Sequence, residues 1–552
     1  MSRLHVLGGL ALTLIGCEGS LLGPRVERPV DPNLPEDAPR ELPAPSSRAP
    51  RLSHVEYENA VRDLLGAAQT LGVTANFTAD NTSSTFDNNG GDLNVTSTQW
   101  TDYQTAAEDL ARRATLDLPT LTTIAGGTLP TDDRALIAAL GRRIYRRDLT
   151  TAELDAQLTL FGEGLTYYPT LAPRLAGARL VLEALFQSPH FLYRLELSTV
   201  ATGEVIPLSG GELAARLSFG LWQSTPDEAL LTAAADGSLL TIDGYTAQVN
   251  RMLLDSRARQ ATQAFHAQLL QQSKFADITR STNLFPEFTV ALRESMKQEQ
   301  VRFLDDVLFT QQGGLGALFT TPSTYVDQNL ARVYGLSGTF GANFDKVQLS
   351  DGRRAGLFTQ IGFLASLATS TESDPIHRGV FVNHRMLCAP LPAPPNGVPP
   401  LPRPDPSVPK TLRTRITEFT GTGTCGAGCH STFINPIGFA YEHYDALGRW
   451  RDTDNGLQVD ARDTYVFDFT TPRSFDGAVE LGAAMAGEPM AHRCYTQKWV
   501  QFLHGRGLST EDQAMINRIG KASHAQSLPV TTMLRLLVES ESFKTRPAEV
   551  TR

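Results

Sequence analysis

The sequence lacks the short motifs that assign a familiar chemistry. It contains no P-loop, no dinucleotide-binding glycine fingerprint, no serine-hydrolase elbow and no His-Glu-x-x-His pair. Only 5 of its 552 residues are cysteines. Whether the chain is an enzyme is therefore left open by its motifs, and any redox or metal chemistry has to come from a few residues.

Positive charge is also scarce. The chain has 49 Lys and Arg residues against 59 Asp and Glu, which gives a formal net charge of -10. Proteins that bind nucleic acid without sequence preference need a basic surface that displaces counterions from the phosphates. The composition therefore argues against nucleic acid as a partner.

Long apolar runs are missing, with one short run at the N-terminus. "MSRLHVLGGLALTLIGC" places Arg3 before an apolar stretch that is too short to span a bilayer and is typical of a secretory signal peptide. The residues Leu14 to Cys17 resemble a bacterial lipobox, in which the cysteine sulfur receives a lipid. The alternative is an ordinary signal peptide in which Cys17 stands by chance.

The N-terminal pattern predicts an exported lipoprotein. Residues 1–17 are the expected signal peptide and residues 18–50 a Pro-rich, disordered tether. We expect localisation in the cell envelope, with a lipid anchor on Cys17 that holds the protein on a membrane, facing the periplasm or the cell surface.

Most of the remaining chain has helical periodicity. The sequence predicts a mainly α fold of multi-helix, bundle-like domains, with a small irregular, cysteine-containing C-terminal unit and little β structure. Ser53 and Glu56 have capping-box spacing, and Thr150 or Thr151 is expected to cap another helix. The best strand candidate is 464–469, paired with a segment near 457–459. The expected domains are 51–125, 131–200, 205–335, 350–470 with a Pro-rich arm and the cysteine motif, and 475–547.

The segment "TCGAGCHSTF" has the pattern C-x-x-x-C-H, one residue longer than the C-x-x-C-H signal for covalent haem. A c-type haem would use Cys425 and Cys429 as thioether anchors and His430 as the iron ligand. Gly426 and Gly428 would let the extra residue bulge outward without displacing the thiols.

A second axial ligand would be a methionine or a histidine. Met485 and Met490 follow the motif in a segment of small residues and are the expected metal ligands beside His430. The other candidates are His377, His384, Met386, His443 and His492.

Two further interpretations of the cysteines remain open. In an oxidising compartment, Cys425 can pair with Cys429 and Cys388 with Cys494, or each cysteine of the motif can bridge to one of the other two. A zinc site is the third possibility, with Cys425, Cys429, His430 and one further ligand.

Two other polar segments are candidates for chemistry. In "STESDPIHRGVFVNHRML", His377 and His384 are seven residues apart, so they share a helix face and would make a ligand or acid-base pair. The alternative, which we favour, is a helix that begins after Pro375 with its Arg and His side chains in solvent. The segment "EHYDALGRWRD" contains Glu442, His443, Asp445 and Arg449. We expect it to be structural, with an Asp-Arg pair that packs the loop after the cysteines, and a catalytic role is the alternative.

Several segments together resemble one family. They are "RLSHVEYENAVRDLLG", "LGRRIYRRDLTTAEL", "ALFQSPHFLYRLEL", "LSGGELAARLSFGLWQSTPDEAL", "RAGLFTQIGFLASLATSTESDPIHRGVFVNHRML", "NPIGFAYEHYDALGRWR" and "CYTQKWVQFLHGRGL". The chain is similar to multi-domain proteins of planctomycetes and myxobacteria, built from a fixed series of domains of unknown function associated with cytochrome c. The resemblance covers residues 50 to 547 and implies a mostly helical, exported protein, often with a haem motif directly before "NPIGFAYEHYDALGRW".

The functional expectation follows from the haem interpretation. We expect electron transfer or redox chemistry at a single haem c, with a redox partner protein. The alternative is a haem-free, disulfide-stabilised surface lipoprotein that binds a partner or an extracellular polymer. A haem-free hydrolase of such a polymer is a third possibility.

Overall fold

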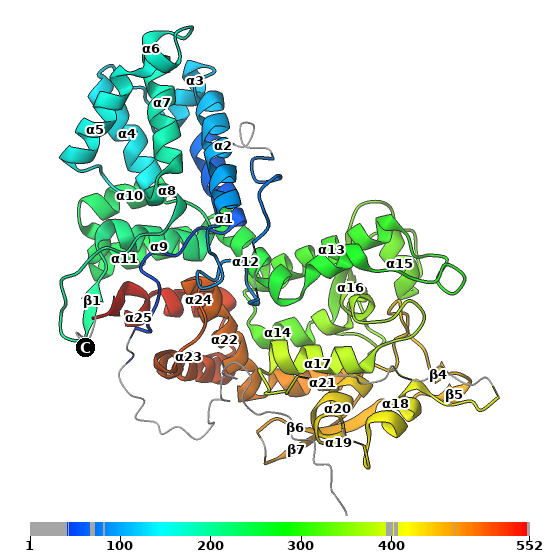
Figure 1. Cartoon of the computed structure of the whole chain (residues 1–552). Helices are drawn as coiled ribbons and strands as arrows, with labels where there is room; N and C mark the ends of the chain where they lie inside the picture. The colour runs from blue at the N-terminus through cyan, green and yellow to red at the C-terminus, as the bar shows by residue number, and fades with distance from the viewer. Residues whose placement is uncertain are drawn as a thin grey trace, which may run out of the picture.

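The computed structural model describes residues 41, 43–66, 72–80, 83–393, 401, 407–424, 426–468 and 470–548. In this part of the chain there are 25 α-helices and four two-stranded antiparallel sheets. The mainly α fold predicted from the sequence is therefore confirmed. Figure 1 places α2, α4, α5 and α7 in one lobe and α13, α15, α17 and α21 in another, with α22 to α25 lying next to α9, α11 and α12.

Among the described residues of the N-terminal lobe, the regular secondary structure consists of α-helices. Its helices are α1 (His54–Leu65), α2 (Ser97–Ala114), α3 (Leu118–Ile124), α4 (Asp133–Tyr145), α5 (Thr151–Gly162), α6 (Gly164–Tyr167), α7 (Pro173–Gln187) and α8 (Pro189–Leu192). The predicted capping box of Ser53 with Glu56 is present, and Thr150 caps α5 with Glu153 as its partner. Local hydrogen bonding thus sets these helix starts, because each cap satisfies backbone N–H groups that have no partner inside the helix.

The central part of the chain alternates helices with short strands. It contains β1 (Val205–Pro207), α9 (Gly210–Trp222), α10 (Glu228–Ala235), α11 (Ile242–Leu254), α12 (Ser256–Leu269), α13 (Val290–Asp305), α14 (Leu315–Thr320), β2 (Ser323–Val326), α15 (Gln328–Tyr334), β3 (Asp345–Gln348), α16 (Ile361–Ser366) and α17 (Pro375–Met386). Helix α9 is the link between lobes: Phe219 packs into the N-terminal core, while Leu217 and Leu221 pack into the larger core.

The C-terminal part begins with short elements and ends in longer helices. It contains α18 (Leu412–Thr420), α19 (Ala427–Cys429), α20 (Asn435–Phe439), β4 (Thr453–Asp454), β5 (Leu457–Gln458), β6 (Arg462–Val466), β7 (Pro472–Asp476), α21 (Ala478–Ala486), α22 (Pro489–His504), α23 (Gln513–Gln526), α24 (Val530–Val538), α25 (Glu541–Lys544) and β8 (Thr545–Pro547). Strand β8 pairs with β1, so the end of the chain returns to residue 205.

One strand prediction needs correction. The strand near 464–469 exists as β6, but its partner is β7 and not the segment near 457–459. Leu457 and Gln458 instead pair with Thr453 and Asp454 across a tight turn. Asn455 and Gly456 both have positive φ, which a two-residue hairpin turn of this kind requires.

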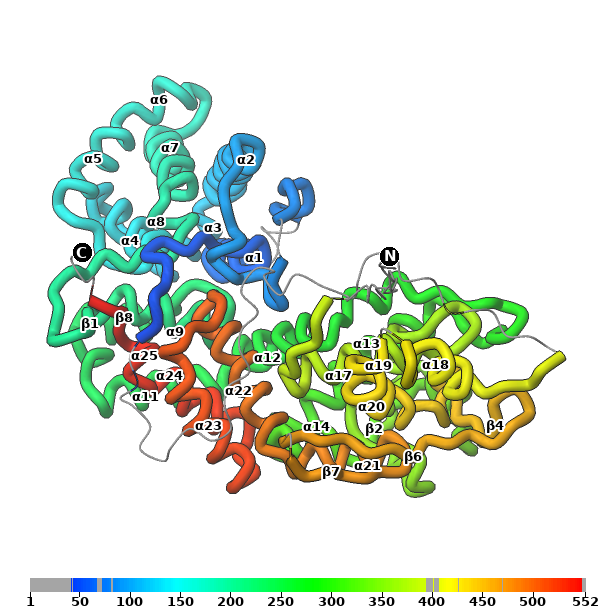
Figure 2. Tube along the Cα trace, turned by 60° about the horizontal axis from the view of Figure 1, so that its bottom comes forward, coloured from blue at the N-terminus to red at the C-terminus, as the bar shows by residue number. Residues whose placement is uncertain are grey.

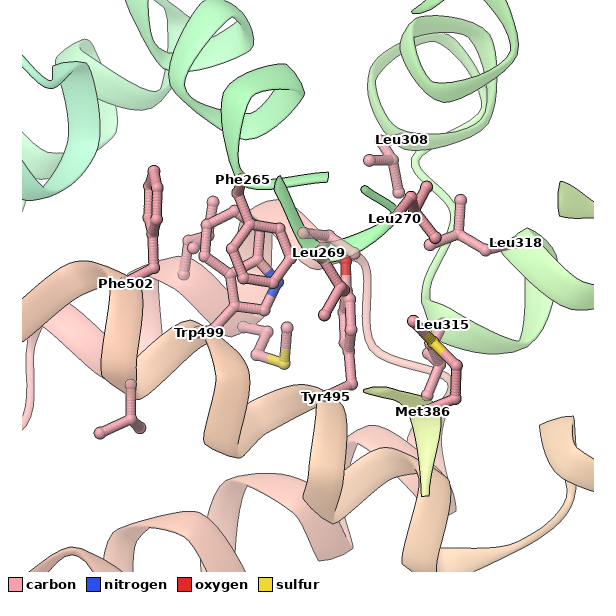
Figure 3. Packing of buried hydrophobic residues seen from close by; sticks show 14 of the residues in the cluster. Phe265, Leu269, Leu270, Leu308, Leu315, Leu318, Met386, Tyr495, Trp499 and Phe502 are labelled. Carbon is pink, nitrogen blue, oxygen red and sulfur yellow. The ribbon is translucent and has the colours of Figure 1, made fainter. Parts of the chain in front are cut away.

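The packing of α22 on α12 anchors the C-terminal helices. The rings of Phe265 and Trp499 are stacked, with centroids 3.6 Å apart and planes inclined by 10°. Figure 3 shows this stacked pair with Phe502 to one side, where its ring meets both of them edge to face, and with Tyr495 one helical turn away from Trp499. Burial of such aromatic surface stabilises the fold by about 2 kcal/mol or more for each ring.

A disulfide joins Cys388, just after α17, to Cys494 in α22. This bond was one of the pairings predicted from the sequence, and it is confirmed. Since both sulfurs are used, neither residue can bridge to Cys425 or Cys429. The bond links residues 106 positions apart, so it restricts the unfolded chain strongly.

We expect the double substitution of Cys388 and Cys494 by Ser to lower the free energy of unfolding by about 4 kcal/mol, the value for closing a loop of this size. The measurement is urea unfolding followed by far-UV circular dichroism. Cys429→Ser is the matched control, because Cys429 is a free thiol. Equal midpoints for the double variant and this control would contradict the assigned role of the disulfide.

Candidate functional site

The cysteine motif lies between α18 and α20. Cys425 lies outside the described residues, whereas Cys429 ends the single turn of α19 and is a half-buried free thiol. His430 follows and begins a π-helical turn, His430–Ile434, that leads directly into α20. The structure thus places the thiol of Cys429 and the imidazole of His430 on consecutive residues of one continuous helical segment.

A chain of hydrogen bonds orients the imidazole of His430. The Nδ1 atom lies 3.2 Å from Oδ1 of Asn435, and Nδ2 of Asn435 donates to Oγ1 of Thr420 at 3.0 Å. Oγ1 of Thr420 donates in turn to the Ile416 carbonyl, so it accepts from the Asn435 amide. The amide oxygen therefore faces His430, and Nδ1 carries the proton because that oxygen only accepts.

This arrangement leaves Nε2 of His430 available. Among the described residues, no hydrogen bond to Nε2 is present. Histidines that bind metals commonly donate one ring N–H to a fixed acceptor, which sets the tautomer and directs the other nitrogen at the metal. The spacing of the motif predicted His430 as an iron ligand, but it did not indicate that Asn435 and Thr420 would orient its ring.

Two glycines fix the position of the π-helical turn. A Cβ atom on Gly379 of α17 would lie 2.1 Å from the carbonyl oxygen of Ile434, and one on Gly438 would lie 2.1 Å from that of Pro375. Helix α17 and the turn therefore approach through backbone contacts that no other residue type permits. This contact holds the Cys429–His430 segment at a fixed distance from the core.

A buried amide strengthens the same contact. Nδ2 of Asn383 donates to the carbonyls of Gly379 and Phe433, and its Oδ1 accepts from the Tyr465 hydroxyl at 2.7 Å. Asn383 thus connects α17, the π-helical turn and β6. The sequence analysis missed Asn383, and the one signal that could have indicated it is a polar residue on the apolar face of a helix.

The proposed methionine ligands occupy other surroundings. Met485 in α21 is fully buried in the large core, and Met490 in α22 packs partly buried against the same core. Helix α21 packs on α14 and β7, while the π-helical turn packs on α17, α18 and α19. Both assignments stay predictions.

The alternative histidine and methionine ligands are engaged in different ways. Both ring nitrogens of His492 have partners, Ser523 and the Ala486 carbonyl, so a metal would have to displace one of them. Nδ1 of His443 forms a hydrogen bond with the Arg451 carbonyl, and the ring of His443 stacks on Trp450. Met386 is buried in the core, whereas His377 and His384 are exposed.

The start of α17 follows the favoured interpretation in part. The helix begins at Pro375 with Asp374 as its cap, and the side chain of His377 is exposed, as predicted. The hydrogen bond to the Asp374 carboxylate raises the pKa of His377. The prediction of solvent-exposed arginines is wrong for Arg378, whose guanidinium is buried and donates to the carbonyls of Leu364, Tyr441, Tyr444 and Asp445.

The predicted Asp-Arg pair after the motif is confirmed as a structural contact. Nε of Arg449 lies 2.7 Å from Asp445, and its Nη1 lies 2.8 Å from Glu287 of a distant loop. Glu442 is buried and interacts with Arg451, and burial raises the pKa of Glu442. Across the described ranges, no three His, Cys, Asp or Glu side chains gather as a metal-binding group.

Five family models match the chain in succession. All five are described as proteins of unknown function: DUF1587 over residues 50–116, DUF1595 over 133–196, DUF1592 over 208–336, DUF1588 over 354–454 and DUF1585 over 472–543. Together they cover most of the chain, and the motif lies within the fourth. Comparisons with curated proteins and with solved structures gave no match.

The close contact at Gly379 gives a test of how the motif is positioned. We expect Gly379→Ala to lower the free energy of unfolding by roughly 2 kcal/mol or more, because the new Cβ meets a backbone oxygen that cannot rotate away. Gly428→Ala is the control, since nothing lies within 4 Å of a Cβ there. Thermal and urea unfolding measure both, and equal stability of the two variants would contradict the packing argument.

Proposed function

Because the chain belongs to the multi-domain, cytochrome-c-associated family composed of these five regions, we propose that it is an exported lipoprotein that carries one c-type haem for electron transfer. The observation that carries this proposal is the environment of His430. Its Nδ1 is held by Asn435, its Nε2 is available, and a free thiol stands on the preceding residue.

The donor set fits a covalent haem. Cys425 and Cys429 would form the two thioether bonds and Nε2 of His430 would bind the iron. A haem bound there would supply reversible one-electron transfer to a partner protein. Asn435 would keep the imidazole plane fixed. By accepting a hydrogen bond from Nδ1–H, it would also make the imidazole more basic. Met485 or Met490 would provide a second ligand to the iron.

The π-helical turn determines how the motif joins α20. The N–H of Asn435 donates to the carbonyl of His430, five residues earlier, so this turn holds one residue more than an α-helical turn. This turn follows Cys429 and joins the thiol and the imidazole to α20, whereas the extra residue of C-x-x-x-C-H lies between Cys425 and Cys429. Helix α20 can then keep its fixed contact with α17 while the thiol and the imidazole stay adjacent.

Export is supported by the disulfide. Bonds such as Cys388–Cys494 form and persist in oxidising compartments, which are reached by secreted and periplasmic proteins. None of the helices in the described part of the chain combines the length and apolar character that a bilayer crossing requires. Cys17 lies outside the described residues, so membrane attachment through its lipid is proposed from the lipobox-like sequence.

A haem-free surface lipoprotein that binds a partner or polymer is the second candidate. It is favoured by the exposure of Gly428, Ser431 and Thr432 around the motif, because a haem macrocycle usually requires more apolar cover. The disulfide between α17 and α22 would serve this function equally well.

The haem proposal is tested by producing the full chain in a host with haem-c maturation machinery. We expect a c-type α-band in the pyridine haemochromogen spectrum and haem that stays with the denatured polypeptide. Cys429→Ala should lose the covalent bond, and Ser431→Ala, an exposed neighbour, should retain it.

Deletion of Ala427 supplies the decisive comparison, since it restores C-x-x-C-H. Haem on the native chain supports the proposal. A native chain without haem, beside a deletion variant that acquires it, would contradict the proposal and favour the haem-free alternative.

The lipid anchor is tested separately by Cys17→Ser. We expect labelled palmitate to be incorporated into the native chain and to be absent from the variant, which should leave the membrane fraction. Unchanged membrane association of Cys17→Ser would contradict lipid anchoring through this residue.

A further inference from the structure

A cavity of about 420 Å³ lies where the two ends of the described part of the chain meet, far along the sequence from the cysteine motif. Its walls come from the segment before α1, the loop before α2, the residues after α8, helix α9, and the C-terminal ends of α22 and α25. In Figures 1 and 2 the blue N-terminal segment runs beside the red C-terminal helices. The volume is within the range of small-molecule pockets, about 300–1,000 Å³.

Backbone hydrogen bonds build the walls from distant segments. The N–H of Arg194 donates to the Pro50 carbonyl at 2.8 Å, and the N–H of Gly90 donates to the Gly505 carbonyl at 2.8 Å. Pairing of β1 with β8 closes another side. The cavity is therefore a product of the fold, because no single region of the chain contains more than part of it.

Three arginines line the cavity, and two of them are neutralised. Arg216 forms a two-point pair with Glu196, at 2.8 and 2.6 Å, and Arg506 forms one with Asp512, at 2.7 and 2.8 Å. These pairs fix the walls and leave little net charge at their positions.

Arg194 is different. Its side chain is more than nine-tenths buried, and its Nε and Nη2 atoms have no hydrogen-bond partner. The nearest carboxylate, that of Glu56, lies 3.9 Å from Nη1, beyond hydrogen-bond distance. Burial raises the pKa of Glu56, which weakens it as a counter-charge. Burying a guanidinium whose N–H donors have no acceptor costs free energy. We therefore expect an acceptor to bind at this position.

Two other polar groups support the same conclusion. Ser542, also more than nine-tenths buried, has a hydroxyl without a partner, and among the described residues the ring of His504 makes no hydrogen bond. Burial, with Arg506, Arg216 and Arg194 nearby, holds the pKa of His504 well below its usual range. The cavity therefore combines a positive potential with unused neutral donors.

We propose that this cavity binds a small organic anion, a molecule whose carboxylate or phosphate group is held by Arg194 and whose polar remainder is held by Ser542 and His504. The proposed ligand matches the cavity in charge and in hydrogen bonding, because an oxyanion would supply acceptors to the unmatched guanidinium. Nothing in the proposed haem chemistry depends on it.

The test uses the full chain, purified in mild detergent, with inorganic phosphate and succinate as probes and glycerol as a neutral control. We expect one of the two anions to give saturable heat in calorimetry and a dose-dependent rise in Tm, while glycerol gives neither. The anion that binds distinguishes phosphate from carboxylate recognition.

Arg194→Gln should weaken binding of that anion by about 10-fold or more, as expected when a buried charged partner is removed. Arg134→Gln is the matched control, because Arg134 is an exposed arginine paired with Asp155, and it should leave the affinity unchanged. Ser542→Ala removes one donor without changing charge and should weaken binding by a few-fold.

The Ser542→Ala variant keeps the proposal testable if Arg194→Gln does not fold. Absence of binding by both anions would overturn the proposal. So would binding that is equally strong in the native chain and in whichever of the Arg194→Gln and Ser542→Ala variants folds.

Discussion

The buried ion pair between Glu196 and Arg216 is the contact on which the joining of the second, third and fifth matched regions depends. Glu196 ends the second matched region, and Arg216 lies on α9 in the third. Nη1 of Arg216 also donates to the carbonyls of Phe543, the last residue of the fifth region, and of Thr545, each at 2.9 Å. Because removing one partner leaves the other buried and unpaired, breaking such a contact costs roughly 3–5 kcal/mol. One guanidinium thus holds three regions together.

The five matched regions share two main hydrophobic cores. The first two regions pack into one core, and Leu217 of α9, Val382 of α17 and Trp499 of α22 belong to the other. Residues from the third, fourth and fifth regions therefore stabilise one another. The family's fixed order has a physical basis in this sharing, since a region removed from the series would expose apolar surface on its neighbours.

Local patterns predicted the fold well and the site only in part. The capping boxes and helical periodicity act within a few residues, so sequence alone located α1 and α5. The strand at β6 was found but was given the wrong partner, although Asn455-Gly456 signalled the neighbouring hairpin. The support of His430 by Asn435 depends on which helices touch, as does the burial of Arg378. The spacing of residues along the chain does not indicate which helices will be in contact.

The disulfide explains how two separate places acquire fixed geometry. Gly379 of helix α17 contacts the backbone of the turn that begins at His430, and Cys388 lies just after the end of this helix. The bond to Cys494 ties that helix to α22, whose final residue, His504, lines the arginine-rich cavity. Continuity of packed elements does not by itself couple two sites, because coupling requires an element with two alternative states. The disulfide therefore preorganises the two sites. It prevents α17, which contacts the turn after the motif, from shifting against α22, which lines the cavity.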